Sequence, residues 1–249
     1  LTPEEAMRVQ GLLGSDIAMQ LDVCPPAQVE RPELVSAVER TTRWAERCLS
    51  ARAPGQALFG IVQGGTDIDL RASHAETLAR LPLDGLALGG FSVGEPPAHM
   101  HRTLAQVVPH VDPGRPRYLM GVGTLLDLVI AIGCGVDMFD CVLPTRNART
   151  GQVFTGGGKL IIKNARYASD LSVLDASCPC PACAGGYSRA YIRHLYQAGE
   201  ILAHRLLTLH NLYCYARLVQ AARLAIIEGR YASWAGERIR ELGAPEPTE

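Results

Sequence analysis

The chain lacks the features of a membrane or secreted protein. No apolar run in its 249 residues approaches the roughly 20 residues that a membrane-spanning helix needs. The N-terminal stretch LTPEEAMRVQ has neither the basic start nor the apolar segment of a signal peptide. It also has no initiator Met, so we expect the natural protein to begin further upstream. These absences predict a cytoplasmic protein with no membrane partner.

Strong charge of either sign is also absent. The net charge of −1 neither favours nor excludes nucleic acid as a partner. Locally, however, no acidic residue lies between Asp140 and Asp170, and this stretch contains Arg146, Arg149, Lys159, Lys163 and Arg166. Such a run is most often a solvated face, and alternatively it is a binding surface for phosphate groups.

Five strand-like apolar runs alternate with helix-like segments, and this alternation predicts a parallel sheet. The runs lie at residues 16–22, 57–65, 85–90, 117–123 and 136–142. Each ends in a polar or glycine-rich stretch, and such ends converge on one face of a (β/α)8 TIM-type barrel. A doubly wound sheet would need only some of its strand ends to be special. We therefore expect a barrel that is incomplete at the N-terminus, because five strands do not close an eight-stranded barrel.

The pattern changes after Thr150, which predicts a second structural region. The stretch GQVFTGGGKLIIKNARY alternates like a short hairpin, a cysteine cluster follows, and the chain from Ser188 onward is helical in pattern. We expect residues 1–150 to form the partial barrel with the active site. Residues 151–215 would form an inserted zinc-binding subdomain, and residues 216–249 helices that complete the outer layer of the barrel.

Three clustered cysteines, Cys178, Cys180 and Cys183, predict a metal site. Thiolates at this spacing, in a chain without secretory features, suit a tetrahedral structural zinc ion better than disulfides. The alternative is three buried thiols near a turn. A fourth ligand is required, and spacing leaves the choice open among His194, His204, His210 and Cys214, with His210 slightly favoured because a helix could bring it back over the cysteines.

Two carboxylates, Asp22 and Asp140, follow strand-like runs. Such a pair is the minimum needed for chemistry at an anomeric carbon, where one group attacks and the other handles protons. Helix capping or an ion pair is the alternative for either one. Gln63 offers a donor and an acceptor to the edge of a nucleobase, and Gly89–Gly90 allow the backbone to approach a flat ligand. Tyr118 is either a core residue or a platform for a stacked base.

The stretch GGFSVGE lacks the GxGxxG spacing, which argues against a dinucleotide site. Instead the motifs GIVQGG, PRYLMGVG, GVDMFDCVLPTRNAR, CPCPAC and LTLHN together resemble the bacterial type of the queuine tRNA-ribosyltransferase, or tRNA-guanine transglycosylase, family. The resemblance covers nearly the whole chain. It implies a glycosyltransferase (pentosyltransferase) of queuosine biosynthesis, which exchanges guanine at the wobble position of tRNA with a GUN anticodon for 7-aminomethyl-7-deazaguanine. A covalent ribosyl-aspartate intermediate, one structural Zn²⁺ per chain and a homodimer are further implications.

The resemblance also assigns residues to roles. Asp140 matches the catalytic nucleophile. The positions that match the binding site of the base are Asp22, Cys24, Gln63, Gly89, Gly90, Tyr118 and Met120. The positions that match RNA-binding segments are Gly121, Val122, Gly123, Thr124, Leu125, Leu126, Asp127, Thr145, Arg146, Asn147, Ala148 and Arg149. The zinc ligands match Cys178, Cys180, Cys183 and His210.

Two departures from the family pattern matter. The family's general acid/base Asp lies in an N-terminal segment upstream of this chain, so we expect the chain alone to be an inactive fragment. Where many bacterial members have Asp-Glu-Cys, this chain has Asp22-Val23-Cys24. One alternative is a non-catalytic tRNA-binding partner subunit, against which the retained Asp22 and Asp140 argue. Another is an archaeal-type enzyme, but the RNA-binding extension of that class is missing after the zinc region.

Overall fold

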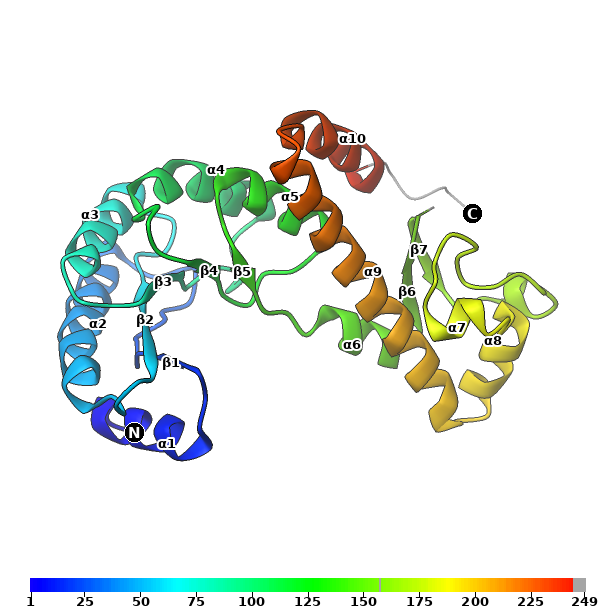
Figure 1. The fold of residues 1–249 in the computed structure, drawn as a ribbon, viewed down its shortest axis with the longest axis horizontal. Coiled ribbons are helices and arrows are strands. Elements are labelled where there is room, and N and C mark those ends of the chain that lie inside the picture. The colour runs from blue at the N-terminus through cyan, green and yellow to red at the C-terminus, as the bar shows by residue number, and fades with distance from the viewer. Residues whose placement is uncertain (157, 244–249) are drawn as a thin grey trace. The chain divides into compact units, whose positions relative to one another are not determined.

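The computed structural model describes residues 1–156 and 158–243 and divides into two compact units (Figure 1). Unit 1 comprises Leu1–Val122 and Ile130–Asp140, and unit 2 comprises Gly123–Val129 and the described chain from Cys141 onward. Each unit has its own apolar core. Within the described residues no helix is long and apolar enough to cross a membrane. The predicted three-part division of the chain stays a prediction.

Unit 1 is built on a curled sheet of five parallel strands in the order β1-β2-β3-β4-β5. The strands are β1 Ile17–Met19, β2 Ala57–Val62, β3 Gly85–Leu88, β4 Arg117–Leu119 and β5 Met138–Phe139. Because every neighbouring pair of strands is parallel, all five strands end on the same side of the sheet, which we call its carboxyl end. The parallel α/β prediction is confirmed, and closure into an eight-stranded barrel stays a prediction.

Helices connect the strands and lie along the outer side of the sheet (Figure 1). They are α2 Arg31–Ala51, α3 Ile68–Ala79 and α4 Pro97–Val107, followed by a 3-10 turn at Val108–His110 and by α5 Leu125–Cys134, which runs from unit 2 into unit 1. An additional helix, α1 Pro3–Leu13, precedes β1. Its signals are present in the sequence: the Thr2 side chain accepts a hydrogen bond from the Glu5 N–H, and Pro3 occupies the first turn.

Side chains satisfy backbone groups at the amino end of the sheet. The Asp84 carboxylate accepts a hydrogen bond from the Leu58 N–H at 2.8 Å, and Asp137 accepts one from the Arg117 N–H at 2.9 Å. These two acidic residues immediately precede β3 and β5. They therefore tie neighbouring strands together, a structural role that is typical of this end of a parallel sheet.

The run VDMFDCV is only partly a strand. The strand β5 ends at Phe139, and helix α6 (Leu143–Arg149) begins a few residues later with Pro144 in its first turn. Val142, which the apolar pattern placed in a buried strand, has 59% of its surface exposed. Proline has no N–H for a strand ladder, but its fixed φ suits the first turn of a helix. The apolar run therefore contains the end of the sheet and, at Val142, the N-cap of a helix.

Unit 2 is organised around the long helix α9 (Ile201–Ile227), which packs against α6, α7, α8, α10 and β6. The predicted hairpin is confirmed as the antiparallel pair β6 Gln152–Thr155 and β7 Gly158–Ile161. The remaining elements are the 3-10 turn Ala165–Tyr167 and the helices α7 Pro181–Ala184, α8 Arg189–Gln197 and α10 Tyr231–Gly243. The core of this unit includes all three clustered cysteines.

Candidate active site and metal centre

Asp22 and Gln63 meet at the carboxyl end of the sheet, beyond β1 and β2. The Gln63 side-chain amide donates a hydrogen bond to Asp22 Oδ2 at 2.6 Å. Burial raises the pKa of the Asp22 carboxyl, and the hydrogen bond from Gln63 opposes this shift. Gln63 is 1% exposed, and its Oε1 atom has no partner in the described chain. Gln63 therefore presents the acceptor atom Oε1 beside the Asp22 carboxyl, whose ionisation is made costly by burial.

The glycines after β3 pack directly against Gln63. A Cβ atom at Gly90 would lie 2.3 Å from Gln63 Oε1, and one at Gly89 would lie 2.7 Å from Gln63 Nε2. Gly90 also has a φ of 67°, a conformation that L side chains rarely adopt. Burial raises the pKa of the Cys24 thiol. The Gln63 side chain and the Gly90 N–H lower it, so the thiol belongs to the same group of residues. The structure thus brings together Asp22, Cys24, Gln63, Gly89 and Gly90.

Asp140 follows β5 and is exposed at the carboxyl end of the same sheet. Its Oδ1 atom accepts two hydrogen bonds, from the Tyr118 hydroxyl at 2.7 Å and from the Gly121 N–H at 2.7 Å. Within residues 1–156 and 158–243 no hydrogen bond engages Oδ2. One oxygen is therefore held in place, and the other is available for attack on an electrophile.

Tyr118 has a hydrogen-bonding role that sequence reasoning missed. The tyrosine was expected as a core residue or a stacking platform, yet its hydroxyl holds Asp140. Burial and the Asp140 carboxylate raise the pKa of Tyr118, so the hydroxyl remains a donor. Met120 lies two residues further on, where its N–H continues the β4 ladder to Leu88 O at 3.3 Å.

Arg71 and His74, both on α3, are two further residues that sequence reasoning missed. Gln63 N–H donates to His74 Nδ1 at 3.0 Å, and burial lowers the pKa of His74 to about 4, which keeps it neutral. Arg71 is fully buried and donates to carbonyl groups beyond β2 and β3. A signal was available: Arg71 and His74 share the face of α3 that carries Ala75 and Leu78, so polar residues occupy core-facing helix positions.

The first predicted RNA-binding segment, Gly121–Asp127, contains both buried and exposed residues. Gly121 and Thr124 are exposed, whereas Val122, Gly123, Leu125 and Asp127 are buried. A Cβ atom at Gly123 would lie 2.2 Å from Cys141 Cβ, so only glycine fits there. The Tyr215 hydroxyl donates to the Gly123 carbonyl at 2.7 Å, which attaches this loop to α9.

The second predicted RNA-binding segment, Thr145–Arg149, forms most of α6. Arg146 and Arg149 are exposed and lie three residues apart, so they project from one side of the helix. Ala148 is buried, and Asn147 lines the cavity described below. A direct RNA contact for either segment stays a prediction.

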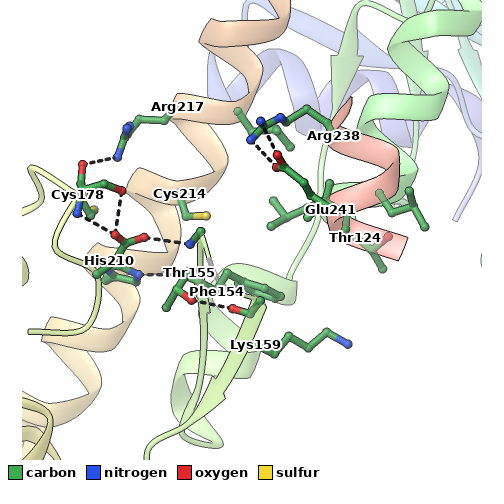
Figure 2. A pocket seen from close by; sticks show the side chains of 18 of the residues that line it. Thr124, Phe154, Thr155, Lys159, Cys178, His210, Cys214, Arg217, Arg238 and Glu241 are labelled. Atoms are coloured by element: carbon green, nitrogen blue, oxygen red, sulfur yellow. Dashed lines mark hydrogen bonds and ion pairs between the residues drawn. The ribbon is translucent and has the colours of Figure 1, made fainter. Parts of the chain in front are cut away.

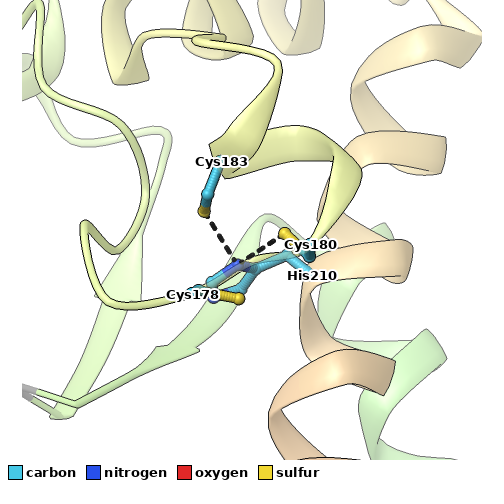
Figure 3. A group of neighbouring side chains, drawn as sticks. All are labelled: Cys178, Cys180, Cys183 and His210. Atoms are coloured by element: carbon cyan, nitrogen blue, oxygen red, sulfur yellow. Dashed lines mark hydrogen bonds between the residues drawn. The ribbon is translucent and has the colours of Figure 1, made fainter.

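Cys178, Cys180, Cys183 and His210 form a buried cluster in unit 2 (Figure 3). Their candidate ligand atoms all lie within 4.8 Å of one another, and His210 Nδ1 is 3.4 Å from the sulfur atoms of both Cys180 and Cys183. The other ring nitrogen, Nε2, is 2.7 Å from the Phe154 carbonyl, to which it can only donate. This tautomer directs the Nδ1 lone pair toward the sulfurs, as a metal ligand requires. The four residues could therefore hold a metal ion.

Of the open candidates for the fourth ligand, geometry selects His210. The His204 ring instead packs edge-on against the Tyr196 ring, with 5.3 Å between the ring centres. In the described chain the cluster includes none of the other three candidates, His194, His204 and Cys214. Asn211, the next residue on α9, is fully buried. Its side chain donates to Pro144 O at 2.9 Å and accepts from Phe154 N at 3.1 Å. One turn of α9 thus connects the cysteine cluster with α6 and β6.

A cavity of about 780 Å³ lies beside this cluster within unit 2 (Figure 2). Thr124, Phe154, Cys178, His210 and Arg217 are among the residues that line it. The labelled side chains come from the loop at Thr124, from the hairpin of β6 and β7, from the loop at Cys178, and from α9 and α10. The cavity therefore adjoins the candidate metal centre and the loop at Thr124, whereas Asp22 and Asp140 belong to unit 1.

At neutral pH, Asp22→Asn is expected to raise the melting temperature of the unliganded protein. Because burial raises the pKa of folded Asp22, ionisation costs free energy in the folded chain and not in the unfolded chain. This cost is absent below about pH 4, where Asp is protonated in both states, and it grows as pH rises toward the folded pKa. Calorimetry should show a difference of about 2 °C or more at pH 7 that closes near pH 4.

The matched control is Asp84→Asn, which removes a carboxylate at the amino end of the same sheet. Asp84 pairs with Arg52 at 2.9 Å, so its neutralisation should lower the melting temperature. Equal melting temperatures for wild type and Asp22→Asn at pH 7 would contradict the burial cost assigned to Asp22.

Comparison with known proteins identifies the family of the chain. The family described as queuine tRNA-ribosyltransferase matches residues 1–244. A protein of that name from Sorangium cellulosum (strain So ce56) is 68% identical over 235 residues, which are 94% of this chain and 60% of the relative. Its namesake from Solidesulfovibrio magneticus is 51% identical over 239 residues, covering 95% of this chain and 64% of that protein.

A third relative with the same name, from Nostoc sp., is 49% identical over 232 residues, with 93% of this chain and 62% of the relative covered. The chain thus spans about three fifths of the length of the curated relatives that it matches. The match nevertheless includes both units and every candidate residue discussed above. The chain belongs to the queuine tRNA-ribosyltransferase family.

Proposed function

We propose that this chain carries the base-exchange site of a tRNA-guanine transglycosylase. The observation that supports this most directly is the geometry of Asp140, whose Oδ1 is held by Tyr118 and Gly121. The free Oδ2 attacks the anomeric carbon of the wobble ribose and displaces guanine. The incoming 7-deazaguanine then opens the ribosyl-aspartate, so two inversions give net retention, as in retaining glycosidases.

The base binds at the carboxyl end of the sheet, between the Asp22–Gln63 pair and the Asp140–Tyr118 pair. Gln63 offers an unpaired acceptor, Asp22 a carboxylate, and Gly90 a backbone N–H that faces the same space as the Cys24 thiol. A purine-like ring presents donors and acceptors along one edge, which matches this mixed set. Tyr118 and Met120 would flank the ring, and 7-aminomethyl-7-deazaguanine is the incoming base that the bacterial-type motifs indicate.

The RNA partner is a tRNA with a GUN anticodon. Arg146 and Arg149, exposed on one side of α6, would contact phosphates or bases, for which the planar guanidinium is well suited. Gly121 and Thr124 would contribute the second contact. The wobble nucleotide must leave its stack to reach a carboxylate at the end of a sheet. The buried members of both segments, such as Val122 and Ala148, would support these contacts from inside the protein.

The cysteine cluster would hold a structural zinc ion. Three thiolates with one imidazole are a typical structural zinc donor set, and four protein ligands leave no position for a catalytic water. When bound, zinc would crosslink the loop of α7 with α9. Because Asn211 joins α9 to α6, the ion would also stabilise the helix that carries Arg146 and Arg149.

The remaining features of the proposal follow the family resemblance. The five strands would be part of an eight-stranded barrel, with residues 151–215 as an inserted subdomain and the last helices on its outer layer. The protein would act as a cytoplasmic homodimer. The alternative is a non-catalytic tRNA-binding partner, but such a subunit would not need a carboxylate held as Asp140 is.

The activity is tested by incorporation of radiolabelled guanine into a tRNA with a GUN anticodon. The full-length gene product that contains this chain should be used, because the family's acid/base Asp matches no position here. Asp140→Asn should lower the exchange rate by at least about a thousandfold, since a covalent nucleophile is lost. Binding of the tRNA should remain, because Asp140 is not among the proposed RNA contacts.

Asp137→Asn is the matched control, since Asp137 lies three residues earlier and accepts a hydrogen bond from the Arg117 N–H, which an asparagine oxygen can also accept. This variant should retain most of the exchange activity. Undiminished exchange by Asp140→Asn would contradict the proposed mechanism. Tight tRNA binding by wild type without any exchange would favour the non-catalytic partner.

The zinc proposal predicts one equivalent of zinc per chain, measured by elemental analysis of the purified protein. Cys180→Ala should lose the metal and lower the melting temperature, because the crosslink between α7 and α9 is broken. Cys214→Ser, on α9 but outside the cluster, should retain both. Full zinc content in Cys180→Ala would show that the ion is held elsewhere.

A further inference from the structure

A buried cation lies directly behind the base-binding backbone. Arg71, on α3, has no exposed surface, and its guanidinium lies 3.9 Å from the centre of the Phe91 ring. In the described part of the chain it forms no ion pair, and Glu95 is the acidic residue whose charge acts on it. Burial lowers the pKa of Arg71 to about 9, which still leaves it charged at neutral pH.

The guanidinium is directed instead at backbone carbonyl groups from two loops. It donates to the carbonyl of Val62, the last residue of β2, at 3.3 Å, and beyond β2 to that of Gly65 at 2.5 Å. Beyond β3 it donates to those of Gly89 at 2.8 Å and Gly90 at 3.3 Å. These are the loops that carry Gln63 and the glycine pair. A single side chain therefore fixes both walls of the proposed base site relative to each other.

The bond to Gly89 O has a consequence for the next peptide group. In a trans peptide the C=O and the following N–H point in opposite directions. A Gly89 carbonyl that faces Arg71 therefore turns the Gly90 N–H away from Arg71. Burial raises the pKa of the Cys24 thiol, and the Gly90 N–H is among the groups that lower it, so this N–H acts on the Cys24 side of the peptide.

Burial of a charge for packing alone would be unfavourable. An unpaired buried cation costs more than an apolar side chain of similar volume, and only its hydrogen bonds offset that cost. All the acceptors of Arg71 in the described chain belong to the last residue of β2 and to the two loops at the proposed site. Space is also restricted, since a Cβ atom at Gly90 would lie 3.4 Å from Arg71 Nη2 and closer still to Gln63.

We propose that Arg71 is a positioning residue for base binding, which holds the Gly89–Gly90 peptide so that the Gly90 N–H faces the base. This inference rests on the proposed function, because it assigns the ligand of that N–H as an acceptor atom of a purine-like base. Arg71 itself touches no substrate. It acts through the backbone and through the loop of Gln63.

The test compares Arg71→Lys with Arg115→Lys in the full-length gene product. Lysine keeps the charge but, as a single compact donor group, cannot span carbonyls of two loops. Arg115 is the matched control because it also holds two carbonyls, Leu81 O at 3.0 Å and Ala79 O at 2.9 Å, and belongs to the amino end of the sheet. Isothermal titration with guanine should show a Kd at least tenfold higher for Arg71→Lys and an unchanged Kd for Arg115→Lys.

A second measurement needs no ligand. The Gly90 N–H lowers the pKa of the Cys24 thiol, so a turned peptide would raise it. Alkylation of Cys24 by iodoacetamide at pH 8, followed by peptide mapping, should be about threefold slower in Arg71→Lys and unchanged in Arg115→Lys. If Arg71→Lys does not fold, Phe91→Leu removes the stacked ring and should weaken guanine binding in the same direction.

The outcomes separate the inference from the proposed function. Weaker guanine binding together with slower alkylation supports both. No guanine binding by wild type, with alkylation still slowed in Arg71→Lys, would refute the proposed function and leave the positioning role intact. An unchanged Kd in a folded Arg71→Lys or Phe91→Leu variant, or unchanged Cys24 alkylation, would overturn the positioning role.

Discussion

Parallel pairing of five short strands is the constraint on which the candidate site depends. Because the strands run in one direction, all their carboxyl ends lie at one side of the sheet, and the backbone groups beyond them have lost their ladder partners. Side chains must satisfy these groups. Arg71 and His74 do so behind the site, and Gly121 N–H is satisfied by Asp140 itself. The same requirement therefore shapes both the fold and the arrangement of reactive groups.

The two ends of the sheet use carboxylates differently. At the amino end, Asp84 and Asp137 accept hydrogen bonds from the first residues of neighbouring strands and serve stability. At the carboxyl end, Asp22 is half-buried, which makes its ionisation costly, and Asp140 keeps one oxygen unengaged by the described residues. This division is typical of parallel β/α proteins, in which the carboxyl end carries the chemistry. Position relative to the strand thus distinguishes acidic residues that the sequence alone presents as equivalent.

Local sequence signals predicted the parts of the structure that local interactions determine. The hairpin and the alternation of strands with helices follow from hydrophobic period, Pro and Gly. The fourth metal ligand could not be chosen by spacing, because α9 returns His210 to the cysteines through tertiary packing. Arg71 was missed for the same reason: its acceptors come from loops on two different strands. The short helix α6 was missed because it directly follows an apolar run that begins as a strand.

Covalent trapping is the measurement that tests the nucleophilic role of Asp140 most directly. The full-length protein would be incubated with a GUN-anticodon tRNA and 9-deazaguanine, digested with ribonuclease, and analysed by peptide mass spectrometry. A ribosyl-linked fragment should be found on the peptide that contains Asp140, bound at that carboxylate, and should be absent from Asp140→Asn. A ribosyl group on Asp22, or an undiminished adduct in Asp140→Asn, would contradict the assignment of Asp140 as the nucleophile.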